Sequence, residues 1–125
     1  MHVSQLFHRL LEENPSAAEK VIAVHGDVSQ PNLGMSDKDY AKVTEEVTIV
    51  FHIAAVVSFT KPLRYMANQN SVSVKHVIEF ARKLKKLEAL VCTSTAFSNS
   101  NQHEKIEETI YRLPWTGERF LKALE

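Results

Sequence analysis

The chain has 125 residues, 44% of them hydrophobic, and its 15 basic residues balance 15 acidic ones. This length is typical of one domain, and the composition is apolar enough to bury a core rather than to stay disordered. The neutral net charge argues against a nucleic-acid footprint or a surface that binds anionic membranes. One cysteine excludes an internal disulfide and a cysteine-based zinc site, and only three glycines leave the chain short of tight, phosphate-binding turns.

A helix and then a strand are predicted in the first part of the chain. Residues 3–13 carry apolar side chains at helical intervals, and Pro15 ends this predicted helix. Residues 21–25 form a short apolar run of strand length, which Gly26 and Asp27 interrupt.

A second helix and strand are predicted in the middle of the chain. Ser36 followed three residues later by Asp39 is typical of a helix N-terminus, so a short helix is expected toward Val43. Residues 48–55 indicate a second buried strand, and Pro62 begins a short helical turn.

The clearest helix is predicted over residues 70–86, where apolar positions form one stripe and basic residues fill the last turn, next to the negative end of the helix dipole. Residues 88–93 indicate a third strand, in which Cys92 is expected to belong to the core rather than to act as a nucleophile. Residues 96–114 are polar and irregular, and the chain ends on a helical pattern at Phe120, Leu121 and Leu124.

Apolar strands that alternate with helices favour an α/β fold. Near-continuous apolar strands suit a parallel sheet covered on both faces, and the alternation suits right-handed crossover units. No domain boundary is visible, so residues 1–125 are expected to form one unit. The longest apolar stretch, Val47 to Phe59, is well short of the roughly 20 residues of a spanning helix, so no membrane segment is expected.

Small and polar residues follow the predicted strands, at the end of the sheet where ligands of open parallel sheets bind. A small residue lets a flat ligand approach the backbone, and a carboxylate accepts hydrogen bonds from amino or hydroxyl groups. A hydroxyl donates to a carbonyl oxygen as that oxygen becomes negative. The residues in question are, in chain order, Gly26, Asp27, Ala54, Ala55, Thr93, Ser94, Thr95 and Ala96.

Four segments resemble the fatty acyl-CoA reductases, which are extended short-chain dehydrogenases that reduce acyl-CoA to fatty alcohol with NADPH. The similar segments are Gly26–Gly34, Ile49–Ala55, Thr93–Asn99 and Ile106–Tyr111, and they occur in the family's order and spacing. The resemblance runs from about residue 3 to the end. It implies a fragment of a doubly wound parallel, Rossmann-like sheet that lacks its first strands, and hence a partial NAD(P)-binding domain.

Two motifs of the family are absent from the sequence. No glycine-rich fingerprint is present, and no tyrosine is followed four positions later by lysine, since Trp115 stands four residues after Tyr111 and Glu118 four before Lys122. The resemblance places these motifs upstream and downstream, so the chain is expected to be inactive alone. For the full-length protein the resemblance implies NADPH, a long-chain fatty acyl-CoA substrate, and a place on the cytosolic face of the endoplasmic reticulum or peroxisome membrane.

The resemblance also assigns cofactor-binding residues. Asp27, flanked by Gly26 and Val28, matches the family's aspartate beside the adenine, and its alternative role is a turn or helix-capping aspartate. Ala54 and Ala55 match the segment that lines the ribose and nicotinamide, and the alternative is plain packing after a strand. His52 in the same motif is expected to be a partly buried structural histidine.

Asn70 matches an asparagine that holds an active-site water or a backbone kink in related dehydrogenases, and its alternative role is a helix N-cap. Three positions later the family usually has glycine and then threonine, whereas this chain has Ser73 and Val74. Thr95, with Ser94 as the neighbouring choice, matches the catalytic hydroxyl that holds the substrate carbonyl. The alternative is a strand-end hydroxyl satisfied by the backbone.

Two other functions remain open at this point. One is a thioester reductase domain that acts on an acyl group bound to a carrier protein. The other is a non-catalytic, truncated paralogue that binds a partner reductase. Both share the predicted fold, so the fold alone does not separate them.

Overall fold

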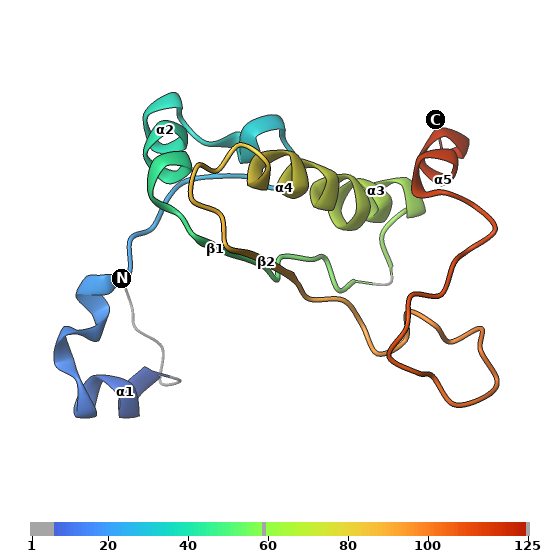
Figure 1. Ribbon diagram of the computed structural model, residues 1–125, viewed down its shortest axis with the longest axis horizontal. Coiled ribbons are helices and arrows are strands. Elements are labelled where there is room, and N and C mark those ends of the chain that lie inside the picture. The colour runs from blue at the N-terminus through green and yellow to red at the C-terminus, as the bar shows by residue number, and fades with distance from the viewer. Residues whose placement is uncertain (1–6, 59, 125) are drawn as a thin grey trace.

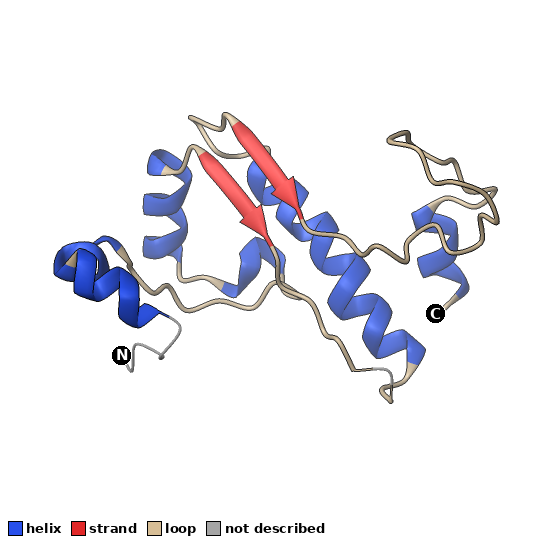
Figure 2. Ribbon diagram, turned by 90° about the horizontal axis from the view of Figure 1, so that it is seen from below, coloured by secondary structure: helices blue, strands red, loops and turns tan. Residues whose placement is uncertain are grey.

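A parallel pair of short strands packed against one long helical rod forms the centre of the structure, a computed structural model that describes residues 7–58 and 60–124 (Figure 1). Strand β1 (Ile49–His52) pairs with β2 (Ala89–Cys92), and Figure 2 shows their arrows pointing the same way. Parallel strands need a long crossover connection, and here the rod supplies it. The predicted parallel α/β arrangement is confirmed.

The rod is helical from Leu63 to Ala81 and consists of three consecutive pieces. These are α3 (Leu63–Ala67), a π-helical segment η4 (Asn68–Val72) and α4 (Ser73–Ala81). The helix predicted over 70–86 is therefore present, but it begins and ends several residues earlier than predicted. Pro62 sets the start, as the sequence indicated, and the basic residues after Ala81 lie in turns beyond the helix.

The elements before β1 lie to one side of this centre. They are α1 (His8–Glu13), the 3₁₀ segments η2 (Pro15–Lys20) and η3 (Pro31–Gly34), and α2 (Asp37–Glu46). Ser36 caps α2 as predicted, since its hydroxyl oxygen accepts from the Asp39 N–H at 3.2 Å. Of the helix predicted over 3–13, residues 3–6 lie outside the described residues.

The strand predicted over residues 21–25 is wrong. The segment has no strand partner among the described residues, and Val21, Ile22 and Val24 are exposed. A strand exists only where a neighbour pairs with its backbone groups. In doubly wound sheets, strands that follow one another across the switch point are not neighbours. The apolar run before Asp27 therefore gains no partner from β1, the next strand in the chain.

The core lies between the rod and one face of the strand pair. Its buried apolar side chains are Ala67, Val77, Phe80, Ala81 and Leu84. Only one face of the strand pair is covered, because His52 of β1 is buried while Phe51, on the opposite face, is 64% exposed.

Two expectations about buried side chains meet different outcomes. His52 is buried, in line with its expected structural role. Cys92 was expected in the core and is exposed instead, because β2 ends there at an uncovered edge.

The remaining chain after β2 runs out from the centre before it returns as α5 (Gly117–Ala123) (Figure 1). The irregular segment predicted over 96–114 and the final helix are both confirmed. Within the described residues, no helix combines the length and apolarity that a membrane span requires.

Candidate functional site

The carboxyl ends of the two strands bring two of the predicted segments side by side. The ladder continues past both strands, because the Thr93 N–H donates to the His52 carbonyl at 3.0 Å. The segments that contain Ala54 and Ala55 and Ser94 and Thr95 therefore leave the sheet from adjacent positions, and the two chains then diverge (Figure 2). All four residues are exposed.

Asn70 holds the segment that follows β1. Its amide nitrogen donates to the Val56 carbonyl at 2.9 Å, and its amide oxygen accepts from the Val56 N–H at 2.8 Å. One side chain thus satisfies both backbone groups of a residue 14 positions earlier, as a neighbouring strand would. The alternative of a helix N-cap is wrong, because Asn70 lies inside the continuous rod.

The position of Asn70 coincides with an irregularity of the rod. It is the middle residue of the π-helical segment η4, and such single π-turns occur frequently at functional sites. Three residues on, Ser73 is completely buried and its hydroxyl donates to the Gln69 carbonyl at 2.6 Å. A serine side chain therefore fits where the family usually has glycine, since its one polar group is bonded.

Asp27 lies in a tight turn after the unpaired segment. Its Oδ1 accepts from the Ser29 N–H at 2.9 Å and from the Ser29 hydroxyl at 2.7 Å. These bonds, the hydroxyl's first, lower the pKa of the carboxyl below its ordinary value of 3.8. Asp27 therefore stabilises the turn through Oδ1, as its alternative role predicted. Its second carboxylate oxygen makes no hydrogen bond among the described residues.

The loop beyond Asp27 closes through a left-handed turn. Asn32, Leu33 and Gly34 have φ angles of 53°, 58° and 60°, which residues other than glycine rarely adopt. The turn brings the Leu33 carbonyl to 2.7 Å from the Asp27 nitrogen. A Cβ on Gly26 would meet that carbonyl at 2.8 Å, so only glycine allows this approach.

Thr95 bonds within its own segment. Its Oγ1 accepts from the Phe97 N–H at 3.3 Å, and its carbonyl accepts from the Ser98 hydroxyl at 2.9 Å. The expected alternative, a hydroxyl satisfied by backbone, is therefore present. The Thr95 proton is still available, because the hydroxyl is the acceptor in its bond to Phe97. Ser94 makes no hydrogen bond among the described residues.

Two residues that the sequence analysis did not select connect the Asp27 loop to the rod. His76 Nδ1 lies 3.4 Å from the Val28 carbonyl, and Lys83 Nζ lies 3.3 Å from Asn32 Oδ1. No local pattern of the sequence marks them, because their partners lie 48 and 51 residues away. Among the described residues, no hydrogen bond joins Asp27 directly to Ala55 or Thr95; the rod contacts the Asp27 loop through His76 and the segment after β1 through Asn70.

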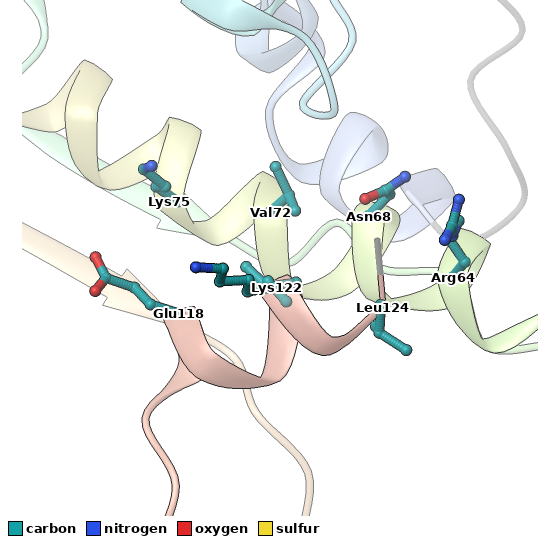
Figure 3. A pocket seen from close by; sticks show the side chains of 8 residues that line it. Arg64, Asn68, Val72, Lys75, Glu118, Lys122 and Leu124 are labelled. Carbon is teal, nitrogen blue, oxygen red and sulfur yellow. The ribbon is translucent and has the colours of Figure 1, made fainter.

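A cavity lies elsewhere, between the outer face of the rod and α5 (Figure 3). Its volume is about 490 Å³, and its side chains mix cations with apolar groups. They are Arg64, Asn68, Val72, Lys75, Glu118, Leu121, Lys122 and Leu124. None of the predicted site residues lines it, so the candidate site remains the strand ends and the loops that the rod holds. The described residues contain no cluster of histidine, cysteine, aspartate and glutamate suited to a metal ion.

A strand, helical crossover and parallel strand form the βαβ unit of an α/β protein, and nucleotide-binding folds repeat this unit. Comparison with known families gives a more specific assignment. The NAD-binding family described as male sterility protein matches residues 1–124, and the chain belongs to this family. Its members are nicotinamide-dinucleotide-binding domains, so the predicted cofactor class and Rossmann-like fold are confirmed at that level.

The similar curated proteins are fatty acyl-CoA reductases, as the resemblance implied. Fatty acyl-CoA reductase 1 of Xenopus laevis is 37% identical over 121 residues, which are 97% of this chain and 23% of the relative. The human reductase 1 is 34% identical over 121 residues, with the same coverage of both chains. Human reductase 2 is 33% identical over 122 residues, or 98% of this chain and 24% of the relative. The chain thus spans about a quarter of the length of these relatives.

Proposed function

We propose that the chain forms part of the dinucleotide-binding domain of an NADPH-dependent, alcohol-forming fatty acyl-CoA reductase. The substrate would be a long-chain acyl-CoA, and the full-length protein would lie on the cytosolic face of the endoplasmic reticulum or peroxisome membrane. The observation that best supports a ligand site is the shared carboxyl edge, where Thr93 bonds to His52 and the two post-strand segments leave from adjacent positions. The names of the similar proteins support the reaction.

The donors and acceptors at the site fit a dinucleotide. Asp27 has an exposed carboxylate with one oxygen committed to Ser29, and the other is available to a ligand amino or hydroxyl group. Ala54 and Ala55 carry the smallest side chains that still fix the backbone, so a flat ring can approach the chain there. Gly26 gives the Asp27 loop its compact form.

The proposed reaction converts a thioester to an alcohol in two reductions. Bound NADPH would supply the hydride for each reduction: the first hydride and one proton would convert the thioester to an aldehyde and the CoA thiol, and a second hydride and proton would give the alcohol. Thr95 would donate its hydroxyl proton in a hydrogen bond to the carbonyl oxygen as that oxygen becomes negative. The Asn70 contact with Val56 would keep the post-β1 segment at the distance that the ligand needs.

Nucleotide binding tests the proposal first, in a chimera in which the chain replaces the matching 121 residues of the Xenopus laevis reductase, because the chain itself lacks the glycine fingerprint that binds the diphosphate. Fluorescence titration should show NADPH binding that Asp27→Leu weakens, whereas Asp37→Leu, which changes an exposed aspartate outside the site, should leave it unchanged. Absence of NADPH binding would contradict the proposal and favour the non-catalytic paralogue.

The reaction itself is tested in the same chimera. The chain would replace the matching 121 residues of the Xenopus laevis reductase, and NADPH oxidation would be followed with palmitoyl-CoA. We expect turnover by the chimera and none by the 125-residue chain, whose sequence lacks both the glycine fingerprint and the Tyr-x-x-x-Lys pair. A chimera that folds and binds NADPH but turns over only a carrier-bound acyl group would favour the thioester reductase.

A further inference from the structure

Two side chains of the rod and the turn after it contact the loop that carries Asp27. His76 donates from Nδ1 to the Val28 carbonyl at 3.4 Å, and Lys83 donates from Nζ to Asn32 Oδ1 at 3.3 Å. The Lys83 ammonium also lies 5.8 Å from the centre of the Tyr40 ring, within range of a cation–π contact. These contacts join positions 48 and 51 residues apart, in a loop whose other hydrogen bonds are local.

The Lys83 contact leads to Asp27 in two steps. Asn32, the residue that Lys83 holds, begins the left-handed turn with φ 53°, and Leu33 continues it with φ 58°. That conformation aims the Leu33 carbonyl at the Asp27 nitrogen, 2.7 Å away. If Asn32 relaxes to an ordinary φ, the Leu33 carbonyl moves and Asp27 loses its backbone partner. A side chain in the turn after the rod therefore acts on the conformation of the Asp27 backbone.

We propose that Lys83 and His76 are positioning residues that fix the Asp27 loop for the cofactor. This inference rests on the proposed function, because it takes Asp27 as a cofactor contact. Lys83 acts through Asn32 and the left-handed turn, and His76 acts through the Val28 carbonyl, on the residue next to Asp27. Neither side chain needs to touch the cofactor.

The test compares Lys83→Met with two matched variants of the same chain. Lys83→Arg keeps a donor within reach of Asn32, and Lys86→Met removes the same charge from an exposed lysine three residues further on. Two quantities are measured for each: NADPH affinity by fluorescence titration of the chimera, and the hydrogen-exchange rate of the Asp27 amide by NMR of the 125-residue chain. Lys83→Met should weaken NADPH binding and speed exchange about two- to fivefold, as expected for one exposed charged contact. Lys83→Arg should restore both, and Lys86→Met should change neither.

A double-mutant cycle separates positioning from a direct charge effect. In an Asn32→Gly background, which keeps the left-handed turn accessible and removes the amide, Lys83→Met should have no further effect on either quantity. An undiminished effect there would overturn the proposed route through Asn32. His76→Phe keeps the ring shape without the donor and should also speed exchange of the Asp27 amide.

The two proposals fail in different ways. If the chimera with the wild-type chain does not bind NADPH, the proposed function is wrong, and the exchange rates alone decide whether Lys83 and His76 fix the loop. If NADPH binds but Lys83→Met and His76→Phe leave both affinity and exchange unchanged, the positioning role is wrong and the function stands.

Discussion

The loops around the candidate site differ in how they are held. The loops that contain Val28 and Val56 are bonded to side chains of the rod across 48 and 14 residues of sequence. The segment after β2, which contains Thr95, makes its hydrogen bonds with residues two to four positions away, apart from the ladder bond of Thr93. The residues assigned to the cofactor are thus fixed by the rod, and the residue assigned to the substrate is not.

This difference has a consequence for function. A cofactor is bound in the same way in every cycle, so fixed loops reduce the entropy lost on binding. The segment from 93 to 116 is exposed almost throughout and carries only local bonds, so it can adjust to the substrate with little loss of stability. The predictions below test whether the rod-held loops depend on the bonds that the structure shows.

The largest effect is expected at Asn70. Asn70→Leu removes two hydrogen bonds and leaves the N–H and the carbonyl of Val56 without partners in a half-buried place. We expect a loss of about 2–3 kcal/mol in the free energy of unfolding, measured by urea denaturation. Asn101→Leu, in the exposed segment after β2, is the control and should change it by less than about 0.5 kcal/mol. Equal effects of the two substitutions would remove the distinction between the loops.

Gly34→Ala tests the left-handed turn. Its φ of 60° disfavours a side chain, and the added Cβ would lie 3.0 Å from the Asp27 nitrogen. We expect a loss of about 1–2 kcal/mol in unfolding free energy. Gly117→Ala at the start of α5, where a Cβ meets nothing within 4 Å, provides the matched control and should be neutral or slightly stabilising. If Gly34→Ala were also neutral, the loop would not be held in the conformation described.

Ser73→Ala tests a buried hydrogen bond within the rod. The change removes the hydroxyl that donates to the Gln69 carbonyl at 2.6 Å, without adding volume to a completely buried place. A loss of about 1 kcal/mol in unfolding free energy is expected, the contribution of one hydrogen bond. Ser71→Ala, an exposed serine in the same π-helical segment, should have little effect. A neutral Ser73→Ala would show that the bond compensates only for its own burial.

Local patterns of the sequence predicted the elements that depend on local chemistry. Ser36 with Asp39 marks the start of α2, and the apolar runs predicted as strands over 48–55 and 88–93 contain the shorter β1 and β2. The segment 21–25 has an equally apolar composition but no partner among the described residues, and pairing is a property of the neighbour rather than of the run itself. Composition therefore could not separate it from the two real strands.

The candidate site was predictable only in part for the same reason. The resemblance selected Asn70 and Asp27, but their bonds to Val56 and Ser29 are geometric facts that residue types do not reveal. His76 and Lys83 act through backbone and side-chain groups about 50 residues away, so no local pattern could have marked them. Lys83 in particular was explained by the helix dipole, which applies equally to its neighbours.

The smallest effect is expected at Ser29. Ser29→Ala removes the hydroxyl that contributes most to the low pKa of Asp27, so that pKa should rise toward 3.8 in an NMR titration of the Asp27 carboxyl carbon. The folded-state pKa is depressed, so the Asp27 bonds stabilise the turn above the unfolded-state pKa of about 3.9 and are lost as pH falls through the lower folded-state value. Ser98→Ala, another exposed serine that bonds locally, should not shift the Asp27 titration. If Ser29→Ala leaves the pKa of Asp27 unchanged, the hydroxyl does not donate to the carboxylate, and only the Ser29 backbone N–H holds it.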